Sequence, residues 1–451
     1  MKAYPEYKPS GIDWLDKIPS HWDSMPLKYT VKNQETDFID GDWIESPFIT
    51  ETGVRYLTSG NVGPGFYKEQ GNGFISDETF DKLNCIEVLP GDLLISRLNE
   101  PIARTCEVPE LGYKIITCVD NVIYRPISDI FSRRFMMYQL NSEPFWFNAS
   151  GLSSGATMKR ISRSKLGNIK VIVPPLKEQE VIAAYLDDVT GKVDALIAEK
   201  QTQVEDLRAY RNSIITETVT HGLNPDAPLR HSGIDWLGDI PQHWEMSALK
   251  YLTSKIGSGI TPRGGSEVYL DKGVLFIRSQ NVYPDGLHLD DPKYISESID
   301  ESMSNTRVYT GDILLNITGA SIGRCCVYTM TESANVNQHV CIIRPLCNLI
   351  KNQFLSYVLN SKIGQDQIAL FQTGGNREGL NFEQLKNFAI PLPPRSEQQA
   401  IAEFLDDKTE KIDALIDELN KQLDELAEYR QAVISEAVTG KVDVRDYRPQ
   451  N

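Results

Sequence analysis

With 451 residues, this chain is long enough for two or three domains that each bury a core of their own. Its 41% hydrophobic and 24% charged residues are ordinary for a globular protein. No run approaches the roughly eighteen consecutive apolar residues of a membrane-spanning helix. The first residues lack the apolar stretch of a secretory signal, so we expect a cytoplasmic protein.

The net charge of −16 argues against a nucleic-acid partner, because such partners are held largely by Lys and Arg. The acidic excess is unevenly distributed, however. Residues 176–221 carry 5 basic and 9 acidic side chains, and residues 396–451 carry 7 and 14, whereas the rest of the chain is close to balance. Any surface that meets a polyanion is therefore expected outside these two segments.

The sequence contains an internal duplication with a period of about 220 residues. Residues 10–29 and 232–251 are identical at 13 of 20 positions and share the pattern GIDWL…IP.HW, and residues 178–197 and 397–416 are again identical at 13 of 20. We therefore predict a first domain at 1–175, a shared helix at 176–221, a second domain at 222–395, a shared helix at 396–440 and a tail at 441–451.

The two divergent domains are predicted to be mixed and rich in strands. Runs of β-branched and apolar residues at 274–279, 312–318 and 340–345 alternate with Gly, Asn and Ser turns. Helical patterns occur near 131–142 and 350–363. The predicted fold class is α+β, with two similar α/β domains separated by two long helices.

Each shared segment follows a pair of prolines, Pro174-Pro175 or Pro393-Pro394, which ends the preceding strand. Apolar residues then alternate at steps of three and four, which is typical of a coiled-coil seam. We predict an antiparallel pair with a pseudo-two-fold axis. The alternative is that each helix packs on its own domain or on another subunit. The predicted seam residues are Ile182, Leu186, Val189, Val193, Leu196, Leu207, Ile401, Leu405, Ile412, Leu415, Leu419 and Leu426.

The sequence offers little support for catalysis. Gly319–Gly323 fits the G-x-S-x-G pattern of a serine hydrolase, but the following residues resemble a strand and the aligned position in the first half is Pro101. A tight turn between strands is the favoured interpretation. No phosphate loop, methyltransferase motif or metal-binding cluster is recognisable, and the repeated His21 and His243 are interpreted as structural. We predict that the chain is not an enzyme.

Binding is expected at loops that combine Arg, Lys, Gln, Asn, Ser and Thr, which suit phosphate contact or base recognition. Residues 151–165 concentrate Gly, Ser and basic side chains, although a solvated loop explains the same composition. The loops 58–61 and 278–281 differ between the halves, as do 96–100 and 316–320. The candidates in the first domain are Thr58, Ser59, Asn61, Arg97, Asn99, Arg104, Ser153, Ser154, Lys159, Arg160, Arg163 and Lys165. Those in the second are Arg278, Gln280, Asn281, Thr318, Ser321, Arg324, Thr373, Asn376 and Arg377.

The chain resembles the specificity subunit of prokaryotic type I restriction-modification enzymes over essentially its full length. The resemblance rests on the repeated GIDWL…IP.HW segment, the repeated EQ…I…LDD.T.K.DALI helix start, and the Tyr-Arg pairs at 210–211 and 429–430. It implies two target-recognition domains joined by antiparallel helices. It also implies that adenine methylation and ATP-dependent cleavage belong to partner subunits. S-adenosylmethionine, ATP and Mg²⁺ would bind to those partners, and this chain would bind no cofactor.

The implied partners are double-stranded DNA, two modification (methyltransferase) subunits and restriction (translocase and nuclease) subunits. Because the domains differ in sequence, we expect a bipartite, non-palindromic target whose spacer is set by the helices. Readers one helical turn apart would be separated by about 34–36 Å, or roughly 10 bp. The alternative is a non-catalytic coiled-coil scaffold whose domains bind proteins, which the acidic charge favours and which competition by duplex DNA would test.

Overall fold

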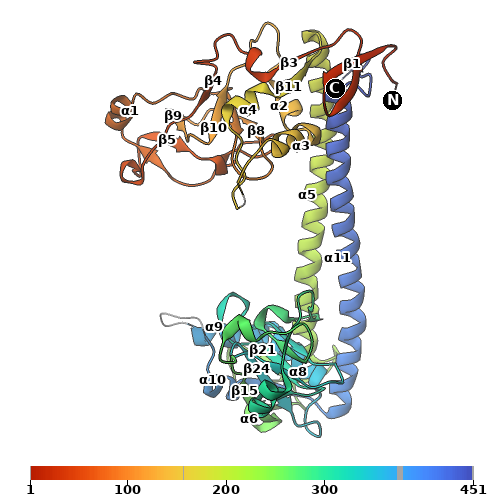
Figure 1. The fold of residues 1–451 in the computed structure, drawn as a ribbon. Coiled ribbons are helices and arrows are strands. Elements are labelled where there is room, and N and C mark those ends of the chain that lie inside the picture. Colours follow the sequence, from red (N-terminus) through yellow and green to blue (C-terminus); the bar gives the residue numbers. More distant parts are fainter. Residues whose placement is uncertain (1, 156, 373–378, 449–451) are drawn as a thin grey trace. The chain divides into compact units, whose positions relative to one another are not determined.

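The chain consists of two units in the computed structural model, which describes residues 2–155, 157–372 and 379–448 (Figure 1). Unit 1 comprises Met1–Gln201 and Lys421–Asn451, and unit 2 comprises Thr202–Asn420. Two long helices, α5 (Leu176–His221) and α11 (Arg395–Val438), contribute one segment each to both units. The range of α5 is the one that the sequence predicts for the first shared helix, and α11 begins one residue before the predicted second one.

In unit 1, a four-stranded antiparallel sheet in the order β4-β10-β7-β8 lies with a smaller sheet, β6-β5-β9, in which β5 and β9 are parallel. Hairpin β1-β2 and the pair β11-β3 complete the strands. The strands are β1 (Tyr7–Ile12), β2 (Leu15–Pro19), β3 (Asp23–Pro26), β4 (Phe38–Asp40), β5 (Val54–Leu57), β6 (Phe74–Ile75), β7 (Leu93–Ser96), β8 (Thr105–Glu107), β9 (Ile115–Thr117), β10 (Asn121–Tyr124) and β11 (Lys170–Val173). The short helices are α1 (Asp77–Leu83), α2 (Arg133–Leu140), α3 (Glu143–Gly151) and α4 (Arg163–Asn168).

Unit 2 repeats this plan with the antiparallel sheet β15-β24-β21-β22 and the mixed sheet β19-β16-β23-β20. Its pairs β12-β13, β14-β25 and β17-β18 are antiparallel. The strands are β12 (Leu229–His231), β13 (Asp239–Pro241), β14 (Glu245–Ala248), β15 (Thr253–Ser258), β16 (Val274–Ile277), β17 (Val282–Tyr283), β18 (Gly286–Leu287), β19 (Lys293–Ile295), β20 (Arg307–Val308), β21 (Ile313–Asn316), β22 (Cys325–Val327), β23 (Ala334–Val336), β24 (Val340–Pro345) and β25 (Ala389–Leu392). The helices are α6 (Leu249–Leu252), α7 (Glu297–Ser302), α8 (Asn352–Asn360), α9 (Lys362–Gln372) and α10 (Phe382–Lys386).

Short sequence stretches that the two halves share form the same Arg–Asp ion pair in each unit. In unit 1, the Arg125 guanidinium donates to both carboxylate oxygens of Asp92, at 2.9 and 2.6 Å. In unit 2, Arg344 donates to Asp312 in the same way, at 2.8 Å for both bonds. Each aspartate also accepts a backbone N–H from three residues earlier, so the turn before the strand is fixed at both ends. The glycine before each aspartate has a positive φ, which explains its retention.

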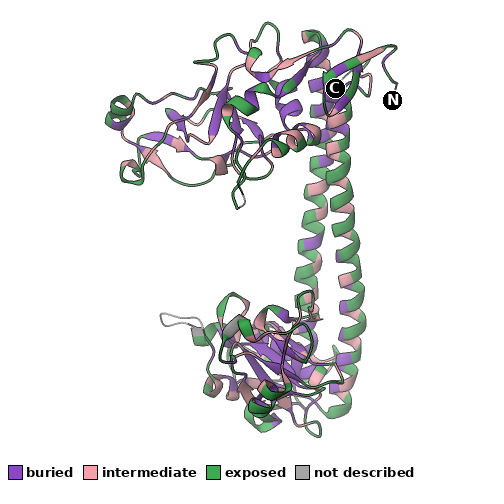
Figure 2. Cartoon of the chain, in the orientation of Figure 1, coloured by how far each residue is buried: buried purple, intermediate pink, exposed green. Residues whose placement is uncertain are grey.

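The repeated tryptophan-containing segment packs into each core, as the sequence predicts. Trp22 and Trp244 are 0% and 1% exposed, and the purple interior of each unit in Figure 2 includes both of these cores. Beside them, His21 and His243 contact Glu178 and Glu397 respectively, both at 2.9 Å. The other repeated tryptophans differ: Trp14 is partly buried on the core, whereas Trp236 is 40% exposed.

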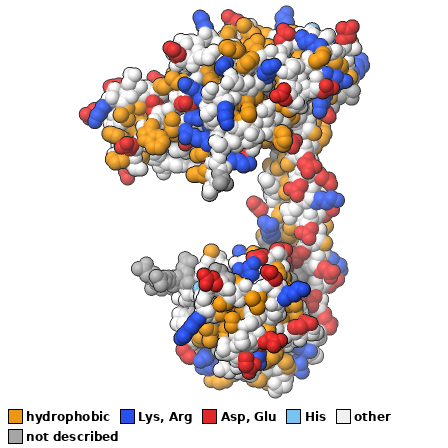
Figure 3. Space-filling view, viewed as in Figure 1, with side chains coloured by type: hydrophobic (Ala, Val, Ile, Leu, Met, Phe, Trp, Pro, Cys, Tyr) orange, Lys and Arg blue, Asp and Glu red, His pale blue; other side chains and the backbone are white. Residues whose placement is uncertain are grey.

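The segments of α5 and α11 lie side by side within each unit. In unit 1, Asp194 pairs with Arg430 at 2.7 Å and Lys200 donates to Gln422 at 2.5 Å, which gives an antiparallel register. In unit 2, Arg211 pairs with Asp413 at 2.8 Å. Apolar contacts there join Val204, Leu207 and Ile214 of α5 to Ile412, Ile416 and Leu419 of α11. Many acidic side chains line both helices (Figure 3).

Two predicted seam residues are wrong. Leu196 and Leu415 are 46% and 55% exposed, whereas Ile416 is buried against Val204. A step of four residues from Ile412 advances about 40° past a full turn, and a step of three falls about 60° short, so the four-residue step keeps Ile416 on the contact face. Ile182, Leu186, Val193, Ile401, Leu405 and Ile412 are buried, and Val189, Leu207, Leu419 and Leu426 are partly buried.

The prediction of a tight turn at the G-x-S-x-G segment is confirmed. The segment contains one turn of 3-10 helix, Gly319–Ser321, between β21 and β22, so the next element after it is a strand. In the part of the chain that the structure describes, none of the helices combines the length and apolarity needed to cross a membrane.

Because Trp244 is fully enclosed and Trp236 is not, the two tryptophans of one repeated segment should differ in their contribution to stability. We expect Trp244→Ala to lower the free energy of unfolding by about 3–5 kcal/mol through cavity formation, and Trp236→Ala to lower it by less than about 1 kcal/mol. Chemical denaturation with hydrogen exchange of unit 2 peptides measures both. Equal effects of the two variants would contradict the core assignment.

Candidate nucleic-acid interface

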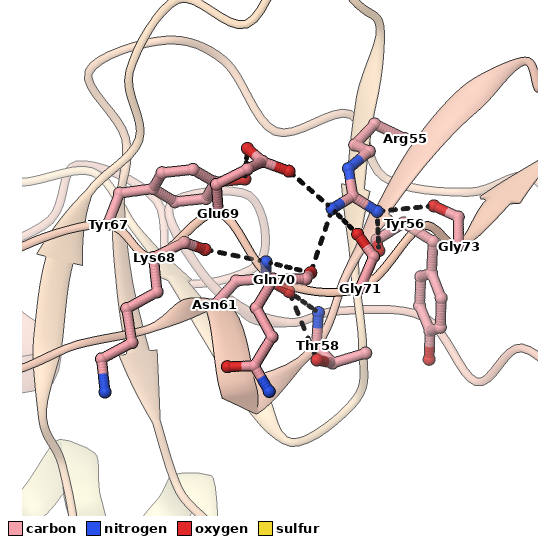
Figure 4. Close-up of polar contacts among 10 residues, drawn as sticks. All are labelled: Arg55, Tyr56, Thr58, Asn61, Tyr67, Lys68, Glu69, Gln70, Gly71 and Gly73. Carbon is pink, nitrogen blue, oxygen red and sulfur yellow. Dashed lines mark hydrogen bonds and ion pairs between the residues drawn. The ribbon is translucent and has the colours of Figure 1, made fainter. Parts of the chain in front are cut away.

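Three loops of unit 1 carry most of the predicted binding residues: 58–73, 97–104 and 150–163. The first is held from inside (Figure 4). Asn61 donates to the carbonyls of Lys68 and Gln70 at 3.0 and 2.8 Å, and its own amide oxygen accepts the Thr58 N–H at 2.8 Å. Asn61 is 1% exposed, so its amide has a structural role.

Arg55 fixes the far part of the same loop. Its guanidinium donates to the carbonyls of Gly71 and Gly73 at 2.7 and 2.9 Å and pairs with Glu69 at 3.0 Å (Figure 4). The side chain is only 3% exposed. In the duplicated half, this position is Leu275, and Arg278 braces the loop of unit 2 instead by donating to the carbonyl of Asp291 at 2.9 Å.

Asn281 of unit 2 repeats the role of Asn61. It donates to the carbonyl of His288 at 2.9 Å and accepts the Arg278 N–H at 3.0 Å, and it is 4% exposed. The two asparagines therefore bond to the residue seven positions later in each half. Both were candidates for DNA contact, and the structure gives their side chains internal partners instead.

Arg104 joins two of the loops of unit 1. Its guanidinium donates to the carbonyls of Val62, Ser59 and Leu98 at 2.7, 2.8 and 2.9 Å, and to that of Asn99 at 3.0 Å. It is 9% exposed. All three of its guanidinium nitrogens donate to backbone carbonyls, so its side chain positions the loops. The aligned Arg324 is half-buried over the ring of Tyr283, at 4.7 Å from the ring centre.

Arg97 lies at the centre of a charged group that we name the Arg97 cluster: Asp40, Arg97, Asp120, Arg160 and Arg163. Arg97 is 4% exposed and pairs with Asp40 at 3.1 Å. Arg160 pairs with Asp120 at 2.9 Å, and Arg163 lies 3.7 Å from Asp40. Three guanidinium groups face two carboxylates, so the cluster carries a net positive charge.

The outer members of this cluster are the ones that can reach a ligand. The Arg160 and Arg163 side chains are 46% and 42% exposed, whereas Arg97 is directed inward to the carbonyl of Ile161 at 3.1 Å. Burial raises the pKa of the Asp40 carboxyl, and Arg97, Arg163 and Arg160 oppose that shift. Arg97 therefore positions Asp40, and Asp40 and Asp120 in turn hold Arg163 and Arg160.

The backbone of this region is the same in unit 2, but the side chains are not. Arg97 N–H donates to the Asp120 carbonyl and Ile161 N–H to the Arg97 carbonyl; in unit 2, Ile317 donates to His339 and Leu380 to Ile317. The isolated bridge Leu98↔Arg160 corresponds to Thr318↔Gly379. Unit 2 therefore has Ile317, His339 and Gly379 where unit 1 has Arg97, Asp120 and Arg160. His339 and Thr318 form a hydrogen-bonded pair there, with Nδ1 and Oγ1 2.5 Å apart.

The remaining candidates vary in exposure. Lys159 pairs with Glu100 at 2.9 Å, and Lys165 donates to the carbonyl of Leu152 at 3.0 Å. Thr58, Asn99, Ser154, Lys159, Lys165 and Gln280 are exposed; Ser59, Ser153, Arg278, Thr318 and Ser321 are half-buried; Thr373, Asn376 and Arg377 lie outside the described residues.

Asp40, Asp120 and Arg55 were missed from the sequence. The residue type gave no signal for Asp40 and Asp120, since an acidic residue in a candidate DNA-binding domain is not an obvious contact. Alignment of the two halves did give a signal, because Arg55 and Asp120 align with Leu275 and His339, so both fall at positions where the halves diverge.

Arg104 provides a test of the internal assignment. We expect Arg104→Ala to lower the free energy of unfolding by about 2–5 kcal/mol, because it leaves several buried carbonyls without a donor. Lys165→Ala, at an exposed position of α4 in the same unit, should change it by less than about 0.5 kcal/mol. Urea denaturation of the two variants decides the matter, and a neutral Arg104→Ala would place that side chain at the surface.

Comparison with known proteins agrees with this architecture. The family described as type I restriction modification DNA specificity domain matches residues 37–206 and 241–425, that is, once in each half. The type I restriction enzyme EcoBI specificity subunit of Escherichia coli is 26% identical over 72% of this chain and 68% of its own length. The putative type I restriction enzyme MjaX specificity subunit of Methanocaldococcus jannaschii is 24% identical over 96% of both chains.

A solved structure from a study of complex assembly and conformational transition of the type I R-M system is similar in fold. It has a TM-score of 0.69 and 17% identity, and the match covers 94% of this chain and 99% of that one. The two family matches together cover well over half of the sequence. The chain therefore belongs to the type I restriction-modification DNA specificity family and is a DNA-sequence-recognition subunit.

Proposed function

We propose that each unit reads one half of a bipartite, asymmetric DNA target. The observation that supports this most directly is the shared backbone around Arg97 and Ile317, which carries different side chains at three aligned positions. A conserved backbone presents side chains at equivalent places, and different chemistry at those places selects different bases. Two unlike half-sites are the expected consequence.

In unit 1, Arg160 and Arg163 are the proposed DNA-contacting residues of the Arg97 cluster. Arg can grip a phosphate or donate to the O6 and N7 atoms of guanine, and both side chains are partly exposed. Asp120 and Asp40 fix their direction before DNA arrives. In unit 2, the exposed Gln280 and the half-buried Thr318 are the corresponding candidates, and both can hydrogen-bond to base edges.

The two long helices are proposed to form an antiparallel coiled coil with a pseudo-two-fold axis, which sets the spacer between half-sites. Asp194 and Asp413 occupy the same repeat position, as do Arg430 and Arg211. The ion pair of unit 1 is therefore the repeat-related counterpart of the pair in unit 2, which supports a symmetric register.

We further propose that this chain carries out no chemistry of its own. Adenine methylation would be performed by two modification subunits and cleavage by restriction subunits, with S-adenosylmethionine, ATP and Mg²⁺ bound to those partners. A duplicated chain offers each surface twice, which suits a partner present in two copies.

The division of labour between units is testable with a panel of half-site variants. We expect Arg160→Ala to weaken binding of one half-site by about 1–3 kcal/mol if Arg160 reads a base, and Gln280→Ala to act only on the other half-site. Binding of the complex with its modification subunits to labelled duplexes measures both. If Arg160→Ala weakened binding equally for every sequence and lowered its salt dependence, Arg160 would be a phosphate contact.

The spacer role of the helices can be tested separately. Adding seven residues to each helix, at 201 in α5 and at the facing position 421 in α11, should lengthen the spacer of the methylated motif and leave both half-sites unchanged. A matched insertion in the loop 109–114 should alter neither. Altered half-sites with an unchanged spacer would refute the spacer role.

The overall proposal is tested by methylome sequencing of host cells with and without this gene. The expected result is one bipartite motif, lost on deletion, with different sequences on its two sides. A continuous or palindromic motif would contradict it.

A further inference from the structure

A cavity recurs at equivalent places in the two units, where the recognition domain meets the long helices. In unit 1 it measures about 530 Å³ and in unit 2 about 300 Å³. We name these the junction cavities. Six repeat positions carry the same residue in both linings: Tyr138, Asn141, Asp187, Thr190, Asp194 and Arg430 in unit 1, and Tyr357, Asn360, Asp406, Thr409, Asp413 and Arg211 in unit 2.

The geometry of the shared residues is also repeated. The Tyr138 hydroxyl donates to Asp187 at 2.7 Å and lies 3.2 Å from the hydroxyl of Thr190. In unit 2, Tyr357 donates to Asp406 at 2.7 Å and lies 3.3 Å from Thr409. Burial is the main cause that raises the pKa of Tyr138, to about 12, so its hydroxyl remains a donor at neutral pH.

The contacts between the domain and the helix explain why the tyrosine and the threonine are retained in both halves, but they do not explain why a cavity lies beside them in both. α2 and α8 share few other residues, and those are chiefly the apolar Phe135 and Leu140 with their counterparts Phe354 and Leu359, which fill the cores. The aspartate side chains remain accessible: Asp187 is 39% exposed and Asp413 is 42% exposed. Accessible acids in a cavity that both halves retain indicate a common ligand.

The outer lip of each cavity comes from the variable domain and includes apolar side chains. Pro64 and Phe66 form it in unit 1, and Pro284 and Leu287 form it in unit 2. Phe66 is 52% exposed. Pro64 and Phe66 belong to the loop 58–73, and Pro284 and Leu287 follow residues 278–281 in unit 2, so a ligand in either cavity would touch a chain segment that carries candidate binding residues.

We propose that each junction cavity receives a basic segment of a modification subunit, with a Lys or Arg side chain reaching the shared aspartate and an apolar neighbour packing on the lip. This rests on the proposed function, which supplies a partner in two copies. Charge supports it, because the helices that form the inner wall hold most of the acidic excess of the chain.

The two cavities differ in charge, and so the two copies should differ in affinity. Each cavity holds one ion pair between the helices, Arg430–Asp194 in unit 1 and Arg211–Asp413 in unit 2. In unit 1, Arg134 also bonds to Asp187, so both of these acids have a cationic partner there. In unit 2, Gln353 replaces Arg134, and Asp285 and Glu410 join the lining. The unit 2 cavity is therefore the more acidic and should bind its copy more tightly.

The test uses the full chain with the modification subunit encoded beside it, without DNA, and measures stoichiometry and affinity by native mass spectrometry and titration. We expect Asp406→Asn to weaken the tighter copy at least tenfold, Asp187→Asn to weaken the other copy, and the double variant to bind neither. Glu180→Gln is the matched control, because this exposed acid of α5 is not retained in the duplicate, which has Gln399.

Photo-crosslinking provides a second readout that does not depend on removing an acid. A benzophenone side chain at Phe66 or Leu287 should crosslink to the modification subunit, and one at Tyr113, which is 56% exposed, should not. Full binding of two copies by the double aspartate variant, or absence of crosslinks from both lips, would overturn the proposal. Either result with an intact bipartite methylation motif would leave the proposed function standing.

Discussion

The structure depends on the hydrophobic core that each recognition domain shares with its segments of α5 and α11. In unit 1, Ile182 and Leu186 of α5 belong to the same buried cluster as Trp22 and the sheet, and Val433–Val438 of α11 contributes to it as well. In unit 2, Ile215 and Val219 join Ile401 and Leu405 in the cluster around Trp244. Moving a domain against its helix segments would therefore open its own core, at a cost of several kcal/mol.

Polar contacts of the same kind lock the first turn of each helix. Gln179 accepts the N–H of Ser132 and donates to the carbonyls of Ile130 and Pro174. Gln398 makes the equivalent three bonds to Lys351, Leu349 and Pro393. Both glutamines are fully buried, so losing either would strand backbone groups. A rigid mount is what a reading domain requires, because base contacts tolerate little displacement.

The regular parts of the fold were predictable because their signals are local. Proline pairs fix the start of each long helix, and steps of three and four predict most of the buried residues on it. Leu196 and Leu415 failed for a physical reason: hydrophobic type does not say which of two adjacent apolar residues, Leu415 or Ile416, faces a neighbouring helix. That choice depends on how the neighbour is placed, which a single sequence does not contain.

The candidate site was harder to predict for a different reason. Arg is suited both to phosphate and to backbone carbonyls, so Arg104 and Arg160 are indistinguishable in sequence, yet one is inside and the other outside. The aligned pair Arg104 and Arg324 suggested a common role, but only Arg104 braces the loops through four carbonyls. Sequence divergence between the halves was a better guide to the candidate binding residues, since the halves differ at positions 97, 120 and 160.

These positions show how one backbone can carry two different sets of side chains. The hydrogen bonds that hold the loops around Arg97 and Ile317 are between main-chain atoms, and the retained Asn, Asp and Arg residues brace them from inside. Side chains such as Arg160 contribute little to that bracing, so they can change without a change in fold. The acidic helices do not conflict with DNA recognition in this scheme, because the Arg97 cluster has three guanidinium groups against two carboxylates, and the effect of charges more than about 10 Å away is largely screened by salt.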